Sequence, residues 1–268
     1  MEEYQPQVPE FYTSVPLKNQ KPGQSLAHNR GKLRINLSSN NYLFCYTSQS
    51  LYMDRSEIEA LADIAYGIFE HYLTTQFHLR KTPLYHLVEE GTSFQNEFNE
   101  IFTQFRELYP ELETHLLERF ASPDEMYRLI IEGEGVIPTK TTQSYWIIQD
   151  APDTDPHATE DERAGKWLIF VQPDQVDEIW KKIRDLTWQK ELGISAKVST
   201  AKKNPDSRDD RKVLYVYTAD WENEDEVMQV REKLRSIGIT DRIGYKRNIE
   251  TFKGEYASKG KRVTYYNA

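Results

Sequence analysis

In the second half of the chain, the spacing of apolar residues alternates between the pattern of strands and the pattern of helices. This alternation restricts the possible folds more than any other feature of the sequence. Four short runs have the apolar or alternating pattern of strands: 141–149 (TTQSYWIIQ), 166–172 (KWLIFVQ), 194–200 (ISAKVST) and 212–218 (KVLYVYT). Two longer runs, 173–192 and 223–238, repeat their apolar residues with the period of a helix. We expect residues 241–257 to add a last strand or hairpin. This order predicts an α+β fold: a curved, mostly antiparallel sheet with helices on one face.

The first half has a different pattern, which predicts a mainly helical domain. Residues 1–30 are rich in Pro, Gln, Ser and Asn, and we expect an extended or poorly ordered entry. Residues 31–48 have the signature of a hairpin. A helix is predicted after Asp54, a second long helix from Leu84 to Leu108, and shorter helices up to about residue 133. We therefore divide the chain into an entry (1–30), an acidic helical domain (31–140) and an α+β domain with a basic tail (141–268).

Charge and two residue types support this division. Residues 1–150 hold 12 Lys+Arg and 21 Asp+Glu, so the whole net charge of -9 belongs to them. Residues 241–268 carry seven basic and three acidic residues. All five tryptophans follow residue 145, and all six histidines occur by residue 157. The acidic helical surface is interpreted as a solubilising face or a docking face for a protein partner.

Several classes of protein are excluded by simple counts. No apolar run approaches the roughly 18 residues that a membrane-spanning helix needs, and residues 1–17 lack the pattern of a signal peptide, so we expect a cytoplasmic protein. The single cysteine, Cys45, excludes an internal disulfide framework. His71 and His78 are seven residues apart, about 10 Å along a helix, which is too far for one metal ion. We expect no metal and no cofactor.

Lys197 is the unusual residue of its strand. Alternation directs Ile194, Ala196 and Val198 to one face and Lys197 to the other. Because the helices must cover the apolar face, Lys197 is expected on the opposite face, where a curved sheet forms a concavity. Lys166 alternates with Leu168 and Phe170, and the local sequence does not decide which set of its strand faces inward.

Basic and aromatic residues interleave in 245–266 (YKRNIETFKGEYASKGKRVTYY), a composition suited to phosphate contacts and base stacking. The loop 201–212 (AKKNPDSRDDRK) is also basic but contains aspartates, so an ordinary solvated loop is an equal alternative. The candidate residues for binding phosphate or nucleic acid are Lys166, Arg208, Arg211, Lys246 and Arg247, with Lys197 as the candidate catalytic group. Trp221 and Tyr245 are the candidate stacking residues.

The segments SYWIIQ, AGKWLIFVQPDQVDEIWKKI, LGISAKVST, VLYVYTADWENEDEVMQVREKLRSIGI and IGYKRNIETFKGEY resemble the basophilic-leukaemia-expressed-protein family. The resemblance covers roughly residues 143–256, and GKW, AKVST and GYK are its most specific parts. It implies a fold like that of the cap-binding translation initiation factor. Members of this family are often labelled as containing a phosphothreonine lyase domain.

The lyase resemblance implies particular roles for particular residues. Lys197 matches a strand lysine that acts as general base, and Lys166, Arg208 and Arg211 match residues that hold the phosphate. The general acid of the lyases is a histidine two residues after the first lysine, and Leu168 occupies that position here. Lys166 or Tyr245 would then have to replace the acid. Whether the protein is an enzyme stays open at this point.

Three functions follow from these observations. The first is binding of a phosphorylated ligand or an RNA backbone through the second domain, as an accessory or complex subunit. The second is phosphothreonine-lyase-like elimination. The third is a protein scaffold that docks through the acidic helical domain.

Overall fold

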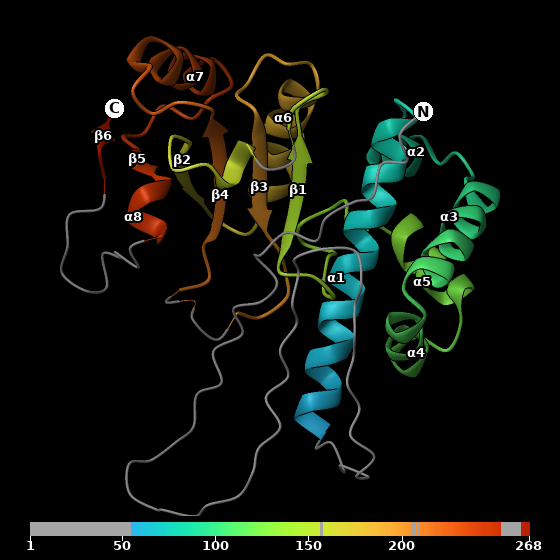
Figure 1. The fold of residues 1–268 in the computed structure, drawn as a ribbon. Coiled ribbons are helices and arrows are strands. Elements are labelled where there is room, and N and C mark those ends of the chain that lie inside the picture. Colours follow the sequence, from blue (N-terminus) through green and yellow to red (C-terminus); the bar gives the residue numbers. More distant parts are fainter. Residues whose placement is uncertain (1–54, 156–157, 205–206, 208, 253–263) are drawn as a thin grey trace, which may run out of the picture.

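The computed structural model describes residues 55–155, 158–204, 207, 209–252 and 264–268, with the side chains of 55–57 and 251–252 left out (Figure 1). The following lie outside the described residues: the entry predicted at 1–30, the hairpin predicted at 31–48, Cys45 and the candidate Arg208. Among the described residues, no helix is long and apolar enough to cross a membrane.

The first part of the described chain is helical, as predicted. Its helices are α1 (Arg55–Leu79), α2 (Leu84–Glu90), α3 (Gln95–Leu108), α4 (Pro110–Arg119) and α5 (Pro123–Ile131). Their core is rich in phenylalanine: the ring of Phe69 meets those of Phe98, Phe102 and Phe105 edge-on, at 5.9, 5.5 and 5.2 Å between centroids. Such edge-to-face pairs add specific attraction to the burial of apolar area.

The long helix predicted from Leu84 to Leu108 is wrong in one respect, because it is broken into α2 and α3. Gly91 takes a left-handed conformation with φ 66° and ends α2. Its N–H turns back to the carbonyls of Leu87 and Val88, which is the usual way in which a glycine stops a helix. Helix α3 then begins after Phe94, whose ring is buried in the core.

The second part is a six-stranded antiparallel sheet in the order β1-β3-β4-β2-β5-β6. The strands are β1 (Trp146–Asp150), β2 (Gly165–Val171), β3 (Ser195–Ser199), β4 (Lys212–Thr218), β5 (Gly244–Arg247) and β6 (Tyr266–Asn267). Helices α6 (Val176–Trp188) and α7 (Glu224–Ser236) connect them, with a short turn at Ala158–Glu160. The predicted α+β fold is confirmed. The final strand expected within 241–257 is present as β5, and it is followed directly by a helix that was not predicted, α8 (Asn248–Phe252).

Helices α6 and α7 pack on one face of the sheet and decide which side of each strand is inside. Trp167 and Ile169 of β2 are buried with Trp180 of α6 and Val227 of α7. The alternate residue Phe170 is 54% exposed. The set that contains Lys166, Leu168 and Phe170 therefore faces away from α6 and α7, which the sequence alone left open.

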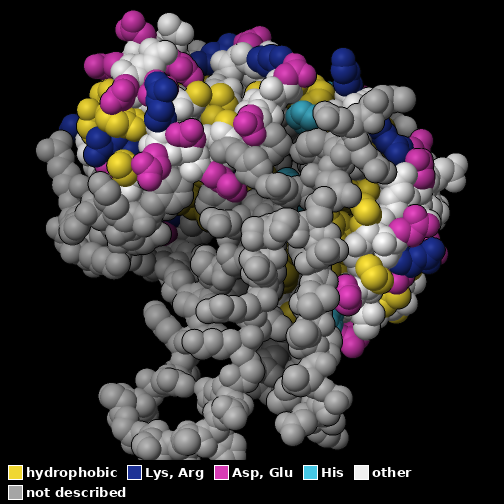
Figure 2. Space-filling model, in the orientation of Figure 1, with side chains coloured by type: hydrophobic (Ala, Val, Ile, Leu, Met, Phe, Trp, Pro, Cys, Tyr) yellow, Lys and Arg dark blue, Asp and Glu magenta, His cyan; other side chains and the backbone are white. Residues whose placement is uncertain are grey.

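The helical part lies beside the edge strand β1, with α1 running along it (Figure 1). The two parts have separate hydrophobic clusters, one within residues 65–136 and one within residues 147–268. Several contacts between them are polar. Asp63 pairs with Lys202 at 2.8 Å, and Glu89 accepts hydrogen bonds from Lys181 and Arg184 at 2.9 Å each. On the face seen in Figure 2, acidic and basic side chains of the described residues are interspersed.

Arg231 provides a direct test of how the sheet part is held together. The side chain is fully buried in α7 and donates to the carbonyls of Ile239, Asp241 and Ala268, at 2.7, 2.7 and 3.1 Å. We expect Arg231→Met to lower the free energy of unfolding by about 3 kcal/mol, because three acceptors lose their donor. Urea unfolding followed by tryptophan fluorescence measures this loss.

Arg235→Met is the matched control. Arg235 lies one turn later on α7, its side chain is 40% exposed, and it pairs with Glu232. We expect the control to change the free energy of unfolding by less than about 0.5 kcal/mol. Equal losses in the two variants would contradict the role given to Arg231.

Candidate functional site

Three lysines lie on the face of the sheet that α6 and α7 do not cover. In the strand register, Lys166 of β2 lies opposite Tyr217 of β4 on one side and opposite Lys246 of β5 on the other. Lys197 of β3 lies opposite Tyr215 of β4. Because residues opposite each other in a sheet point to the same side, all five side chains share one face. Lys197 thus lies on the face opposite α6 and α7, as alternation along its strand predicts.

The ammonium groups of two of these lysines converge on the same two rings. The Nζ of Lys166 lies 5.1 Å from the ring centroid of Tyr217 and 5.7 Å from that of Tyr215. The Nζ of Lys197 lies 5.3 Å from Tyr215, 5.9 Å from Tyr217 and 4.5 Å from Trp146 of β1. The rings of Trp146 and Tyr215 stack at 5.4 Å. We call the six residues Lys166, Lys197, Lys246, Trp146, Tyr215 and Tyr217 the lysine face.

Lys166 is held in place by an asparagine at the start of α8. Its Nζ donates a 3.0 Å hydrogen bond to Oδ1 of Asn248. The Nδ2 of Asn248 donates to the carbonyls of Thr159 and Asp161, at 2.7 and 3.2 Å, and this fixes which end of the amide faces the lysine. Lys166 and Asn248 are both buried, with 7% and 2% exposure. The amine therefore has a defined position.

Burial and neighbouring charge change the acidity of the lysines. Burial, followed by the charges of Lys197 and Lys246, lowers the pKa of Lys166 to about 7. Burial lowers the pKa of Lys197 to about 8. Both changes have the expected direction, because a low-dielectric site and a like charge each disfavour an ammonium. Burial raises the pKa of Tyr217 well above its ordinary value, so this phenol stays protonated.

Two arginines expected at the site lie elsewhere. Arg211 is exposed, pairs with Asp209 at 2.8 Å and lies over the ring of Phe170. Arg247 follows Lys246 in β5, and its guanidinium stacks near Trp221, with 4.6 Å to the ring centroid. The structure thus brings together Lys166, Lys197 and Lys246 of the expected basic residues, and separates Arg211 and Arg247 from them.

The two residues expected to stack on a base, Tyr245 and Trp221, pack against other side chains of the protein. The ring of Tyr245 lies inside the core, with no exposed area, and its hydroxyl shares a 2.6 Å hydrogen bond with Thr218. Alternation in β5 explains this position, since Lys246 takes the opposite face. Trp221 is half-buried, and besides Arg247 it meets the ring of Tyr265 at 5.1 Å. Trp167 is fully buried and donates to the carbonyl of Val227 at 3.1 Å.

Sequence reasoning missed the aromatic part of the lysine face. Tyr215 and Tyr217 alternate in the run KVLYVYT, which showed that they share a face, but only the pairing of β4 with β2 and β3 shows that this face holds the lysines. Trp146 is brought to Lys197 by the pairing of β1 with β3. No local signal marked Asn248.

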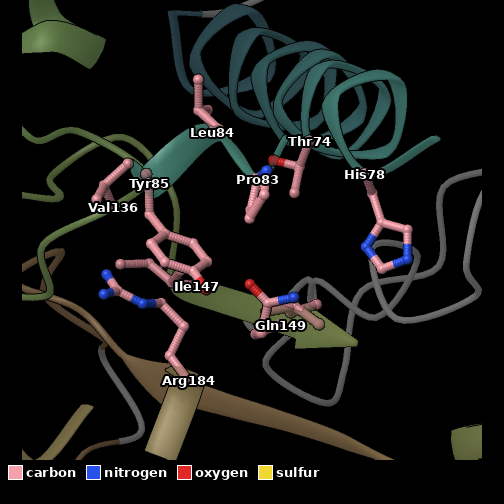
Figure 3. Close-up of a pocket in the computed structure, with 11 residues that line it drawn as sticks. Thr74, His78, Pro83, Leu84, Tyr85, Val136, Ile147, Gln149 and Arg184 are labelled. Atoms are coloured by element: carbon pink, nitrogen blue, oxygen red, sulfur yellow. The ribbon is translucent and has the colours of Figure 1, made fainter. Parts of the chain in front are cut away.

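A separate cavity lies where the helical part meets the sheet (Figure 3). Its volume is about 30 Å³, which is room for one or two water molecules. Tyr85 lines it, and the guanidinium of Arg184 lies over the ring of this residue, 3.6 Å from the ring centroid. Arg184, also in the lining, is already paired with Glu89 and Asp185. The cavity is too small to hold a phosphorylated ligand.

Comparison with solved structures finds weak similarity to translation initiation factor eIF4E from a schistosome. One such structure, in complex with m7GpppA and 4E-BP, has 17% identity, covers 41% of this chain and 63% of its own, and gives a TM-score of 0.32. A second, with m7GpppG and 4E-BP, has the same identity and coverage and a TM-score of 0.31. The chain therefore spans less than two thirds of the length of these structures.

A family model matches part of the chain directly. Residues 157–252 match the model described as basophilic leukemia-expressed protein Bles03. The matched segment contains β2 to β5 with α6 and α7, and it includes Lys166, Lys197 and Lys246. The resemblance seen in the motifs GKW, AKVST and GYK is therefore confirmed: residues 157–252 are similar to the family described as basophilic leukemia-expressed protein Bles03.

Proposed function

We propose that the lysine face binds a phosphorylated ligand through Lys166, Lys197 and Lys246. The observation that carries this proposal is the convergence of two ammonium groups on the rings of Tyr215 and Tyr217, with a third lysine opposite Lys166 in the sheet. A phosphate group accepts hydrogen bonds from several cations at once. Convergent lysines supply such donors from neighbouring strands of one rigid sheet.

The repulsion between the charged lysines favours binding of an anion on the lysine face. Like charges in a poorly hydrated site repel each other, and the lowered pKa of Lys166 reflects that repulsion together with burial. A bound anion reverses the sign of the interaction and favours the charged form of each lysine. Binding is therefore linked to proton uptake, and affinity is expected to weaken as the pH rises above the pKa values of about 7 and 8.

The arrangement favours a compact phosphate group over a long nucleic-acid track. Arg247 and Arg211 are separated from the lysine face and are paired with Glu250 and Asp209. They do not extend the lysine face into a row of cations of the kind that follows a phosphate backbone. An RNA ligand remains an outcome of the binding test, and in that case affinity would fall steeply with salt.

Removing Lys197 tests the binding proposal. We expect a phosphothreonine peptide or inorganic phosphate to raise the melting temperature of the natural protein, because binding stabilises only the folded state, by about 2.7 kcal/mol at a hundredfold excess over Kd. In Lys197→Met this shift is expected to disappear. The unliganded variant should be as stable as the natural protein or more stable, since a half-buried charge is replaced by an apolar group of similar volume. Differential scanning calorimetry measures both effects.

Lys233→Met is the control for general loss of charge. Lys233 lies on α7 and pairs with Glu191 at 2.5 Å. The control should keep the full shift with phosphate. A phosphate-dependent shift that survives Lys197→Met would reject the site.

The pH dependence of stability tests the state of Lys166. Its pKa is about 7 in the folded protein, below the ordinary value of 10.5. The unfolded chain therefore binds more protons between these values, and the contribution of Lys166 to stability rises with pH from about 7 to about 10 and is constant below 7. We expect Lys166→Met to flatten this rise and to increase the free energy of unfolding at pH 7 by on the order of 2 kcal/mol. Urea unfolding at a series of pH values measures both, and an unchanged slope would contradict the assignment.

A second candidate function, β-elimination of phosphate from phosphothreonine, is favoured by one observation. With its pKa lowered to about 8, a fraction of Lys197 is neutral near neutral pH and suited to act as a base. The position of the expected acid is Leu168, which faces the same side of the sheet as Lys166 and donates no proton. Tyr245, considered as a replacement for the acid, lies in the core on the other side.

Mass spectrometry separates the two functions. We expect a phosphothreonine peptide to keep its mass after incubation with the protein, because elimination without an acid loses stabilisation of the leaving group. A loss of one phosphoric acid per peptide that disappears in Lys197→Ala would replace the binding proposal by an enzymatic one.

A further inference from the structure

Lys166 combines three features that rarely occur together in one lysine. Its side chain is 7% exposed, its Nζ donates to a fixed acceptor on Asn248, and two further lysines lie around it. Among the described residues, the charges that act on its pKa are those of Lys197 and Lys246. It is thus a buried amine in a positive environment.

We propose that Lys166 reversibly binds carbon dioxide as a carbamate. In this step the lone pair of Nζ forms a bond to the carbon of carbon dioxide, and one C=O electron pair moves onto oxygen. One proton leaves the nitrogen for solvent. The product is a carbamate anion on Lys166, and no oxidant, reductant or metal is consumed. The reverse step needs only the return of the proton.

The reaction requires a neutral amine, and the environment of Lys166 supplies one. At a pKa of about 7, half of this amine is neutral at pH 7, whereas an ordinary lysine has a neutral fraction that is smaller by roughly a thousandfold. The groups that face it from neighbouring elements are Lys197 on β3, Tyr215 and Tyr217 on β4, Lys246 on β5 and Asn248 on α8. The lowered pKa of a lysine beside other cations is a known way to activate it as a nucleophile.

The product is stabilised by the same neighbours that destabilise the ammonium. Three charged lysines have a formal charge of +3 together, whereas a carbamate with two ammonium groups has +1. The carbamate therefore converts repulsion from Lys197 and Lys246 into attraction. Its nitrogen keeps one hydrogen, which can still donate to Oδ1 of Asn248, so the existing hydrogen bond survives the reaction.

The low exposure of Lys166 selects a small and uncharged reactant. A side chain that is 7% exposed reacts slowly with a bulky carbonyl compound, whereas carbon dioxide has three atoms and no charge. This inference goes beyond phosphate binding and competes with it, because both use Lys166 and a carbamate on this residue is itself an anion beside Lys197 and Lys246. Carbamate formation and phosphate affinity are measured separately, and either proposal can fail alone.

Carbon-13 NMR of the full chain in labelled bicarbonate tests the inference. Between pH 7.5 and 8.5 we expect a carbamate resonance that Lys166→Arg removes, because a guanidinium does not react. Lys233→Arg is the matched control on a half-buried lysine of α7 that pairs with Glu191, and it should keep the resonance. An α-amino group also forms carbamates, so the decisive result is the loss of one resonance in the first variant and none in the second. An unchanged spectrum in Lys166→Arg would overturn the proposal.

Trapping identifies the residue without any substitution, in case Lys166→Arg does not fold. A trialkyloxonium reagent converts a carbamate into a stable ester, and peptide mapping by mass spectrometry then locates it. We expect the ester on Lys166 to depend on added carbon dioxide. An ester found on other residues alone, or no ester on Lys166 under saturating carbon dioxide, rejects the proposal.

Discussion

Burial of one face of the sheet under α6 and α7 is the constraint on which the rest of the structure depends. Trp167 and Trp180 lie fully buried between these layers, and each apolar side chain that enters this core sends its strand neighbours to the opposite side. Antiparallel pairing then aligns those neighbours across strands. The lysine face is therefore a geometric consequence of core formation, since Lys166, Lys197 and Tyr215 occupy the positions that the core excludes. A register slip of one residue would exchange the two sets.

The lysine face is unfavourable for the folded protein when it is empty, and the core must compensate for it. Desolvation and mutual repulsion oppose three ammonium groups, whereas cation–π contacts with Trp146, Tyr215 and Tyr217 and the hydrogen bond to Asn248 recover part of that energy. Residues that cost stability and are held in defined positions by several neighbours are typical of binding sites. The two proposals, phosphate binding and carbamate formation, are alternative ways of neutralising this positive environment.

The sequence predicted the class of fold, most strands and helices, and the face on which Lys197 lies, because these depend on local periodicity. The sequence did not predict which face of β2 is buried, the break between α2 and α3 at Gly91, or the residues that Arg247 contacts. The buried face of β2 depends on which residues the helices cover. The contacts of Arg247 depend on residues that are distant in the sequence. Trp146 and Asn248 were also not predicted as site residues, because residues distant in the sequence bring them next to Lys197 and Lys166. The sequence thus predicted which face of its own strand Lys197 occupies. Which side chains of other strands lie beside it could be known only from the pairing register.

An aromatic pair at the interface between the helical part and the sheet affects the fluorescence of the protein. His78 of α1 meets the ring of Trp188 of α6 edge-on at 5.0 Å, and burial lowers the pKa of this histidine. An imidazolium quenches indole emission more strongly than neutral imidazole does, and only while the two rings stay close. Every tryptophan lies after residue 145, so the helical part contributes no indole signal of its own. Trp188 therefore reports on the contact between the two parts, through the share of the protein's indole emission that is quenched in mild acid.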